Sequence, residues 1–559
     1  MKILLIYPFF IDPRIDDEDI RPMPMGLYWI GAVLKEAGYK VEILNLYDFS
    51  QRKDEIRDIL RSFKPQAIGF SVLHGNRWGA VEIARITKEL FPDTKVIFGG
   101  VGATFLWRHL LRHFPEIDFI VLREGEKSFP QLLDVIKEDS EDYKSVPGIA
   151  YRSGNKLYRT KESGFIDDLD SLPIPSKYFT YQHVSISRGC PWNCNFCGSP
   201  QFWNRRVRFR SPEHFLEEIE ILYKKGIRMF YFSDDTFTLN KSKVLEICDL
   251  ILKKGLKINW NAISRVDQVD EEMLYWMRKA GCIQISYGVE SGSEKIRKAL
   301  NKPIKSEDII KAFEITKRYG ILPRLYLIYG SPGEDEDTID ESIKLMHTIK
   351  PLALITYILD LFPGTRFWNE IKKRQSISDD IWLNKIEGIM YFQLDSLISQ
   401  EMVLSWGNRL RKEFYSHLPQ YVRAIRFEHI EDMKVEYSDF LSRLGMTFSH
   451  GLYSKNPDIP EKEKLSEWLF KQSLRYLNDR RAYLGLSMLK QKQGNIKEAE
   501  KILKKALSIY PEDKDLSLCL AINFMNQSDF KEALKILERL PPSEGIQPYI
   551  DECKKRINH

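Results

Sequence analysis

Over residues 1–140, short runs of β-branched and aromatic residues alternate with longer stretches in which apolar residues recur at helical spacing. One such stretch, Gly26 to Ala37, is followed by Gly38, the residue type that most often terminates a helix. Because strand and helix alternate, we expect a doubly wound, Rossmann-like parallel sheet in an α/β fold. The predicted strands are Lys2 to Ile6, Val41 to Leu44, Ala67 to Ser71, Lys95 to Phe98 and Phe119 to Leu122.

A second alternating region follows a hairpin and a polar connection. Gly154 and Asn155 mark the tip of the hairpin, and residues 167–176 read DDLDSLPIPS, a polar, proline-bearing segment typical of a domain boundary. From His183 onward, six predicted strands separated by helices favour a partial (β/α)6 TIM-like barrel, whose chemistry lies at the C-terminal ends of the strands. These strands are His183 to Ser187, Arg228 to Phe232, Lys257 to Asn261, Ile283 to Tyr287, Arg324 to Ile328 and Leu354 to Leu359.

The remaining chain is helical in pattern. Residues 366–463 are rich in aromatic side chains but carry no motif with readable chemistry. Further on, Lys497-Glu498-Ala499 recurs as Lys531-Glu532-Ala533, a spacing of about 34 residues that is typical of tetratricopeptide repeats. A plain pair of helical hairpins is the alternative. The predicted division is a first domain at 1–140, a hairpin and linker at 141–180, the barrel at 181–365, a helical extension at 366–463 and helical repeats at 464–559.

Composition narrows the class of protein. The 559 residues are 43% hydrophobic and 29% charged, as in a globular multidomain enzyme, and the net charge of +5 gives little reason to expect nucleic acid as the main partner. No apolar run approaches the ~18 residues of a membrane span, and the apolar N-terminus lacks a cleavage site. The chain has seven cysteines, and only three of them lie close together in the sequence. An odd number with this distribution argues against the disulfide framework of a secreted protein. We therefore expect a cytoplasmic protein.

The clustered cysteines, Cys190, Cys194 and Cys197, have C-x3-C-x2-C spacing within RGCPWNCNFCGSP, directly after the first barrel strand. Three thiolates on one loop can ligate three irons of a cubane cluster and leave the fourth iron without a protein ligand. That iron is then open to a substrate or cofactor. A structural zinc site is the main alternative, but it normally requires four ligands, and no fourth cysteine or histidine lies on this loop.

At these residues the sequence resembles the radical S-adenosylmethionine superfamily, whose members carry this motif at the same place in the barrel. The resemblance covers about residues 182–365. It implies a 4Fe-4S cluster on the three cysteines. It also implies that S-adenosylmethionine chelates the open iron and is cleaved, after one-electron reduction, to methionine and a 5'-deoxyadenosyl radical.

The resemblance further implies contacts with S-adenosylmethionine. Phe196 matches the residue whose backbone meets the adenine, and Ser233-Asp234-Asp235 matches the segment that holds the methionine amino group. Glu290, in GVESG, matches a glutamate near the ribose hydroxyls, and Tyr329, in YGSPGE, begins a loop near the adenosyl group. Solvated strand ends, helix caps and ordinary glycine turns are the structural alternatives.

The first domain resembles cobalamin-binding domains. Its third predicted strand ends in Ser71-Val72-Leu73 and its fourth in Gly99-Gly100 followed by Gly102, similar to the S-x-L and G-G elements of that family. Glycine there allows a bulky ligand to approach the backbone, in the crevice where doubly wound sheets bind ligands. Glu124, in REGE, also matches a segment of cobalamin-binding radical enzymes.

One departure concerns the cobalt ligand. The D-x-H-x-x-G segment of many cobalamin domains is absent, and the first histidine of the chain is His74, which is interpreted as a loop or core residue. Axial histidine ligation is therefore not expected. A nucleotide-binding domain or a purely structural one is the alternative for this part of the chain.

The leading hypothesis is a cobalamin-dependent methyltransferase that acts on an unactivated carbon or phosphorus centre. The runner-up is a cobalamin-dependent cyclase or rearrangement enzyme resembling the anaerobic cyclase of chlorophyll synthesis, and the third is a non-enzymatic iron-sulfur or cobalamin sensor. Methylthiotransferases are excluded because no cysteine precedes Cys190. The expected partners are a small-molecule or peptide substrate, a reductant such as flavodoxin or ferredoxin, and a protein at the repeats. No catalytic acid or base is indicated.

Overall fold

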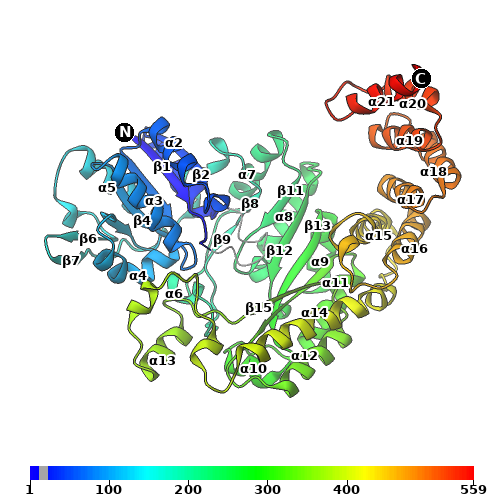
Figure 1. The fold of residues 1–559 in the computed structure, drawn as a ribbon. Coiled ribbons are helices and arrows are strands. Elements are labelled where there is room, and N and C mark those ends of the chain that lie inside the picture. Colours follow the sequence, from blue (N-terminus) through cyan, green and yellow to red (C-terminus); the bar gives the residue numbers. More distant parts are fainter. Residues whose placement is uncertain (12–22, 559) are drawn as a thin grey trace.

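A computed structural model describes residues 1–11 and 23–558. It contains two large sheets side by side, the first mostly parallel and the second wholly parallel, and a helical C-terminal region that leads away from them (Figure 1). The first sheet has the strand order β2-β1-β3-β4-β5-β6-β7. Its elements are β1 (Lys2–Tyr7), α1 (Met25–Glu36), β2 (Lys40–Asn45), α2 (Lys53–Phe63), β3 (Ala67–Ser71), α3 (Arg77–Leu90), β4 (Lys95–Gly99), α4 (Gly100–His113), β5 (Phe119–Val121), α5 (Ser128–Lys137), β6 (Ile149–Ser153) and β7 (Lys156–Arg159).

Helices cover both faces of this sheet. In β1, Ile3 and Leu5 pack with α1 and α5, whereas Leu4 and Ile6 point to the other face and join the core formed with α2, α3 and α4. Because both sets of side chains are buried, the strand has a continuous apolar run rather than an alternating one. The predicted doubly wound architecture is confirmed.

The predicted hairpin is part of the first sheet. Its strands β6 and β7 pair with each other, and β6 pairs antiparallel with β5. The linker proper, around residues 160–182, then leads to the barrel, so the structure associates the hairpin with the first domain.

The second sheet is a six-stranded parallel sheet of order β15-β14-β13-β12-β11-β8, which curves as an open partial barrel. Its strands are β8 (His183–Val184), β11 (Met229–Phe232), β12 (Asn259–Ser264), β13 (Cys282–Glu290), β14 (Leu322–Tyr329) and β15 (Ala353–Ile358). The helices between them are α7 (Pro212–Lys224), α8 (Lys241–Lys253), α9 (Glu271–Lys279), α10 (Glu294–Ala299), α11 (Ser306–Arg318) and α12 (Glu336–Ile349).

The first barrel strand is shorter than the predicted His183 to Ser187. It leaves the sheet after Val184, and Ser187–Arg188 form a separate strand, β9, paired antiparallel with β10 (Arg208–Phe209). The reason is a side chain: Asp234 accepts the backbone N–H of Ser187 at 2.7 Å and replaces the ladder hydrogen bond there.

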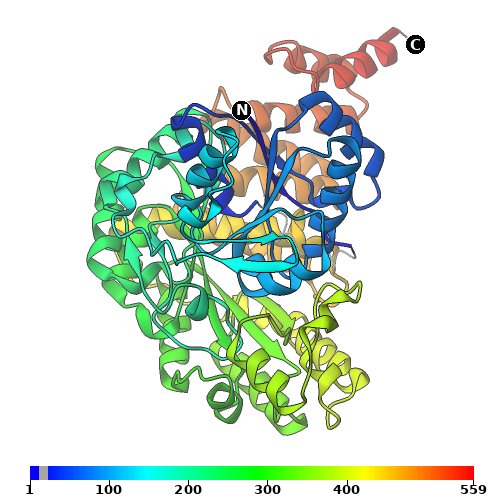
Figure 2. The ribbon, with the colours of Figure 1, turned by 90° about the vertical axis from the view of Figure 1, so that its left-hand side faces the viewer.

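After β15 the chain is helical. A segment containing α13 (Arg366–Arg374) returns to the first domain, where Figure 2 shows it in yellow-green beside the blue helices. The other helices are α14 (Gln400–Arg423), α15 (Lys434–Ser449), α16 (Lys462–Tyr476), α17 (Arg480–Lys492), α18 (Ile496–Ile509), α19 (Lys514–Asn526), α20 (Phe530–Leu537) and α21 (Gln547–Asn558). Among the described residues no helix has the length and apolarity needed to traverse a lipid bilayer.

The C-terminal repeats are two helical hairpins, α17–α18 and α19–α20, which lie on the side of the barrel away from the first domain (Figure 1). Both turns require a left-handed residue: Gly494 has a φ of 76° and Ser528, at the equivalent position, has a φ of 61°. The departure of the second repeat from glycine therefore changes the residue but not the turn.

Asp439 joins the barrel to the helical region. Its carboxylate lies 2.8 Å from Arg278 of α9, 2.9 Å from Arg443 of α15 and 2.8 Å from Arg481 of α17. Burial alone would raise the pKa of Asp439, but the three guanidinium groups outweigh burial and lower that pKa well below its usual range.

We predict that Asp439→Asn lowers the free energy of unfolding by about 2 kcal/mol at pH 7, because it leaves Arg278 buried without its counter-charge. Since the folded-state pKa is lowered, this contribution is fully present above the unfolded pKa of about 3.9 and is lost progressively as pH falls from there through the folded-state pKa. Denaturant titrations at pH 7 and pH 3 should therefore show a gap between wild type and variant that is smaller at pH 3. Asp249→Asn, which breaks an exposed pair with Lys253, is the control and should cost less than ~0.5 kcal/mol. An Asp439→Asn variant as stable as wild type at pH 7 would contradict this role.

Candidate functional site

The loop that carries Cys190, Cys194 and Cys197 connects β9 to the short helix α6 (Ser199–Phe202) and is held by main-chain and amide contacts. Asn195 donates its backbone N–H to Leu300 and its side-chain amide to Ala299, each at 3.0 Å, at the end of α10. On the other side, Asn195 accepts the N–H of Phe367 in α13 at 3.1 Å. None of these hydrogen bonds uses a cysteine side chain. The loop is therefore held in place while its three thiols remain available as ligands.

The three thiols are partly buried and lie close enough to influence one another. Burial raises the pKa of Cys190 to about 11 and that of Cys197 to about 12, and it also raises the pKa of Cys194. Buried thiolates need a positively charged group beside them, and the iron ions of an iron-sulfur cluster would supply it. The donor set therefore fits a cluster held by three cysteines. None of the three is in a disulfide.

Charged side chains surround the cysteine loop. Asp235 accepts a hydrogen bond from Ser199 at 2.6 Å and raises the pKa of Cys190 and Cys197. Glu290 lies 2.5 Å from Lys302, and both influence the pKa of Cys194. Of the residues expected to contact S-adenosylmethionine, Asp235 and Glu290 are thus brought to the cysteines.

Two cations near the cysteines were not found from the sequence. Arg265, the residue directly after β12, stacks on Trp192 at 4.2 Å and pairs with Asp267 at 2.8 Å. Its position at the end of a barrel strand could have indicated it, as it did Asp235. Lys302 lies in a loop beyond α10, and no local pattern marks it.

Three other predicted residues are engaged elsewhere. Asp234 is 2% exposed and accepts hydrogen bonds from Ser187, so its structural task is to shape the start of the cysteine loop. Ser233 pairs with His183 at 2.8 Å on an exposed face. The Tyr329 ring packs against α14, where a Cβ at Gly407 would lie 2.4 Å from the Tyr329 hydroxyl oxygen. Their contacts with S-adenosylmethionine stay predictions, as does that of Phe196, which is partly buried against the core.

The residues expected to bind cobalamin line one edge of the first sheet. Ser71 and Gly99 are paired across the ends of β3 and β4, and Asn76 accepts the N–H of Leu73 at 2.8 Å, which fixes the loop after β3. At Gly102, a Cβ would lie 2.5 Å from the backbone carbon of Leu73. Gly100 has a φ of 91°. These two glycines therefore serve the close contact between α4 and the β3 loop, whereas Gly99 has no such constraint.

This edge faces the barrel. A Cβ at Gly198, the residue after Cys197, would lie 3.9 Å from the Val101 side chain at the start of α4. His74, after β3, lies 3.1 Å from Asp360 after β15 and contacts the Phe362 ring at a centroid distance of 4.3 Å. His74 is thus a residue of the domain interface. The glycine-lined edge of the first domain and the cysteine loop lie across from each other.

Glu124 connects the two domains through buried ion pairs. Its carboxylate oxygens lie 2.6 Å from Arg188 and 2.7 Å from Arg208, and one also accepts the N–H of Ile166 at 2.9 Å. Arg188, two residues before Cys190, pairs in addition with Glu126 at 2.7 Å. The expected role of Glu124 toward cobalamin stays a prediction, and the structure gives its carboxylate a second role between the domains.

The segment after α13 binds the first domain. Arg77 of α3 donates to the carbonyl of Ile386 at 2.6 Å and to that of Glu387 at 3.0 Å, and its guanidinium lies 4.9 Å from the centroid of the Trp382 ring. Trp382 is fully buried. This contact gives residues 379–387, which had no readable motif, a structural function.

Comparisons with known proteins agree with this arrangement. The family model described as the Radical SAM superfamily matches residues 184–346, that of the B12 binding domain matches residues 21–133, and that of a tetratricopeptide repeat matches residues 491–551. The matches confirm the predicted order of domains along the chain: a cobalamin-type domain, a radical S-adenosylmethionine barrel and tetratricopeptide helices.

Among curated proteins, an uncharacterized methyltransferase of Pyrococcus horikoshii is 31% identical over 380 residues, which cover 66% of this chain and 82% of that protein. The anaerobic magnesium-protoporphyrin IX monomethyl ester cyclase of a Synechocystis strain is also 31% identical, over 68% of this chain and 79% of the cyclase. Among solved structures, the cobalamin-dependent S-adenosylmethionine radical enzyme OxsB shares the fold, with a TM-score of 0.59 and 18% identity over all of this chain and 84% of OxsB.

Proposed function

The chain belongs to the cobalamin-binding radical S-adenosylmethionine enzymes, and from that premise we propose that it transfers a methyl group to an unactivated carbon or phosphorus centre. When bound, the cluster and S-adenosylmethionine supply a 5'-deoxyadenosyl radical, and cobalamin carries a methyl group. The observation that supports the proposal is the position of the cysteine loop opposite the glycine-lined edge, where a Cβ at Gly198 would lie 3.9 Å from the Val101 side chain. A substrate between the two sites would be reached from both.

The chain's own residues would then bind and orient. Cys190, Cys194 and Cys197 would hold the cluster, Asp235 would face the amino group of S-adenosylmethionine, and Glu290 would approach its ribose. Cation and carboxylate attract strongly in a site with little water. Lys302, paired with Glu290, keeps that carboxylate from being buried alone.

The interdomain contacts matter for this reaction because the two cofactors must keep their distance and angle during transfer. Glu124 with Arg188 and Arg208 supplies one fixed contact near the cysteine loop, and Arg77 of α3 with residues 382–387 supplies another. The proposal includes a cytoplasmic enzyme that receives its electron from a flavodoxin or ferredoxin and docks a protein partner on the repeats.

A cobalamin-dependent cyclisation or rearrangement is the second candidate, favoured by the identity to the Synechocystis cyclase. The two differ in their products. A methylase would form one S-adenosylhomocysteine and one 5'-deoxyadenosine for each methyl transferred, whereas a cyclase would form 5'-deoxyadenosine alone.

The test is anaerobic reconstitution with iron, sulfide and hydroxocobalamin, followed by chromatography of S-adenosylmethionine products under a low-potential reductant. We expect 5'-deoxyadenosine together with S-adenosylhomocysteine whose formation requires cobalamin. Formation of 5'-deoxyadenosine without cobalamin-dependent S-adenosylhomocysteine, even in a single turnover, would favour the cyclase.

Gly99→Ala tests the cobalamin edge separately. The nearest atoms to a Cβ at Gly99 are 3.7 Å away, and its φ of −147° suits any residue, so the fold should be unchanged. A methyl group in the path of a packed ligand should weaken cobalamin retention by about tenfold or more, measured by gel filtration and absorbance. Gly26→Ala, on α1, where nothing lies within 4 Å, is the control. Unchanged retention in Gly99→Ala would place the ligand elsewhere.

A further inference from the structure

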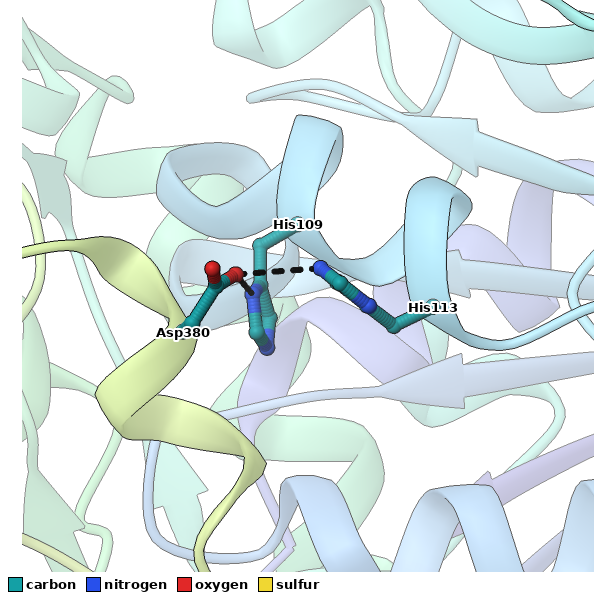
Figure 3. A group of neighbouring side chains, drawn as sticks. All are labelled: His109, His113 and Asp380. Carbon is teal, nitrogen blue, oxygen red and sulfur yellow. Dashed lines mark ion pairs between the residues drawn. The ribbon is translucent and has the colours of Figure 1, made fainter.

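A histidine–aspartate cluster lies outside the cofactor sites described above. His109 and His113 occupy adjacent turns on one side of α4, and Asp380 reaches them from the 3₁₀ turn Asp379–Leu383, which follows α13 (Figure 3). The three side chains point toward one another. Their ligand atoms all lie within 4.8 Å of each other.

The cluster lacks the hydrogen bonds that buried polar groups ordinarily make. The His109 side chain is 3% exposed, and within residues 1–11 and 23–558 neither of its ring nitrogens has a hydrogen-bond partner. Nε2 of His113 lies 3.1 Å from Oδ1 of Asp380 but is out of line for a hydrogen bond. Leaving such groups unsatisfied is costly, so an unpartnered imidazole held against a carboxylate calls for a ligand.

The spacing suits a metal ion. At a bond length of ~2.1 Å, two ligands of a tetrahedral ion stand about 3.4 Å apart. The distances from Asp380 Oδ1 to His113 Nε2, 3.1 Å, and to His109 Nδ1, 3.9 Å, lie on either side of that value. Small side-chain rotations would therefore bring all three ligands to one ion. The Asp380 side chain is 56% exposed, so a water molecule can reach the fourth position.

A second cluster, His347, Glu413 and His417, lacks these features. Its side chains are about a third exposed, at 37%, 36% and 35%. Its imidazoles already have partners, since the Tyr421 hydroxyl lies 2.8 Å from Nδ1 of His347 and Nδ1 of His417 lies 2.9 Å from the Glu413 carbonyl. We therefore assign no site to it.

We propose that His109, His113 and Asp380 bind a divalent transition-metal ion of the zinc class, which fastens the 379–383 turn to α4 of the cobalamin-type domain. Two imidazoles and one carboxylate form a donor set suited to such ions. The ion would join two segments some 270 positions apart in the chain, next to Trp382, and would add to the contacts of Arg77. This site is distinct from the cysteine loop and independent of the methyl-transfer proposal.

Zinc retention tests the site. The full chain, with its cluster reconstituted so that the cysteines are occupied, is dialysed with Zn²⁺ and then against zinc-free buffer before elemental analysis. We expect about one zinc per chain for wild type and less than about a tenth of that for His113→Ala and Asp380→Asn. His429→Ala, an exposed histidine outside both clusters, should retain as much as wild type. Equal retention in Asp380→Asn and wild type, or none in wild type, would overturn the assignment.

Two further measurements separate the alternatives. Zinc X-ray absorption should show nitrogen and oxygen at ~2.0–2.2 Å and no sulfur at ~2.3 Å, because sulfur would place the ion on the cysteine loop and overturn the proposal. Melting in the presence of chelator should give the same Tm for His113→Ala and wild type, and added Zn²⁺ should raise the Tm of wild type only. A zinc-induced rise in both proteins would also refute the site. Neither measurement depends on methyl transfer, so the two proposals fail separately.

Discussion

Replacing Cys194 with alanine is expected to abolish cluster assembly while leaving the fold intact. Three thiolates are the fewest that hold a cubane with one open iron, and no other cysteine lies on the loop to substitute. Iron and sulfide content after reconstitution should fall more than about tenfold, and 5'-deoxyadenosine formation at least ~1000-fold, since cleavage of S-adenosylmethionine requires the cluster.

The fold should survive this change because the cysteine loop is held by Asn195 and its neighbours and not by the thiol. We expect circular dichroism to be unchanged and the free energy of unfolding of the apoprotein to fall by about 1 kcal/mol or less. Cys519→Ala, in α19 of the repeats, removes a more deeply buried thiol and should keep the full iron content. A full iron complement in Cys194→Ala would contradict the assignment of the ligands.

Glu124→Gln is expected to destabilise the contact between the two domains by about 3–5 kcal/mol, because it leaves Arg208 buried without its counter-charge and Arg188 with Glu126 alone. The side chains of Glu124, Arg188 and Arg208 are 3%, 12% and 4% exposed, so solvent cannot compensate. Denaturant unfolding of the apoprotein, followed by tryptophan fluorescence, measures the effect. Cobalamin is left out so that a loss of ligand binding cannot imitate a loss of stability.

Asp167→Asn is the matched control for this experiment. Asp167 pairs with Arg206 in the same part of the chain, but those side chains are 73% and 50% exposed. Exposed pairs contribute little, so the control should change the free energy of unfolding by less than about 1 kcal/mol. If Glu124→Gln leaves apoprotein stability unchanged and weakens only cobalamin retention, the carboxylate serves the ligand and the interdomain role is wrong.

Much of the fold was predictable because its signals are local. Strands β1, β3 and β4 are buried on both faces, so each is a short apolar run that stands out between amphipathic helices. The repeats were visible because the equivalent residues of successive hairpins lie at a constant spacing. Strand β8 was predicted too long, since its end is decided by the Asp234 carboxylate, which lies after strand β11, about fifty residues further on.

The candidate site was predictable in part. Three cysteines within eight residues define their own loop, and a resemblance to a known family assigns their chemistry. The neighbouring Asp234 and Asp235 could not be separated by sequence, because adjacent residues at a strand end point in different directions and only packing decides which one faces the cysteines. Asp235 faces the cysteine loop, where it accepts a hydrogen bond from Ser199, two residues after Cys197. Asp234 instead accepts the backbone N–H of Ser187.

The sequence by itself therefore determined the order of the domains, the positions of most strands and the loop of three clustered cysteines, because these depend on local pattern and short spacing. Tertiary structure alone decided that Glu124 pairs with Arg188 and Arg208, that Arg77 binds residues 382–387, and that His109 and His113 meet Asp380. The physical reason is that a buried charge or imidazole is satisfied by whatever the fold brings beside it. Such partners can stand hundreds of positions away in the chain and leave no periodicity or motif that marks them.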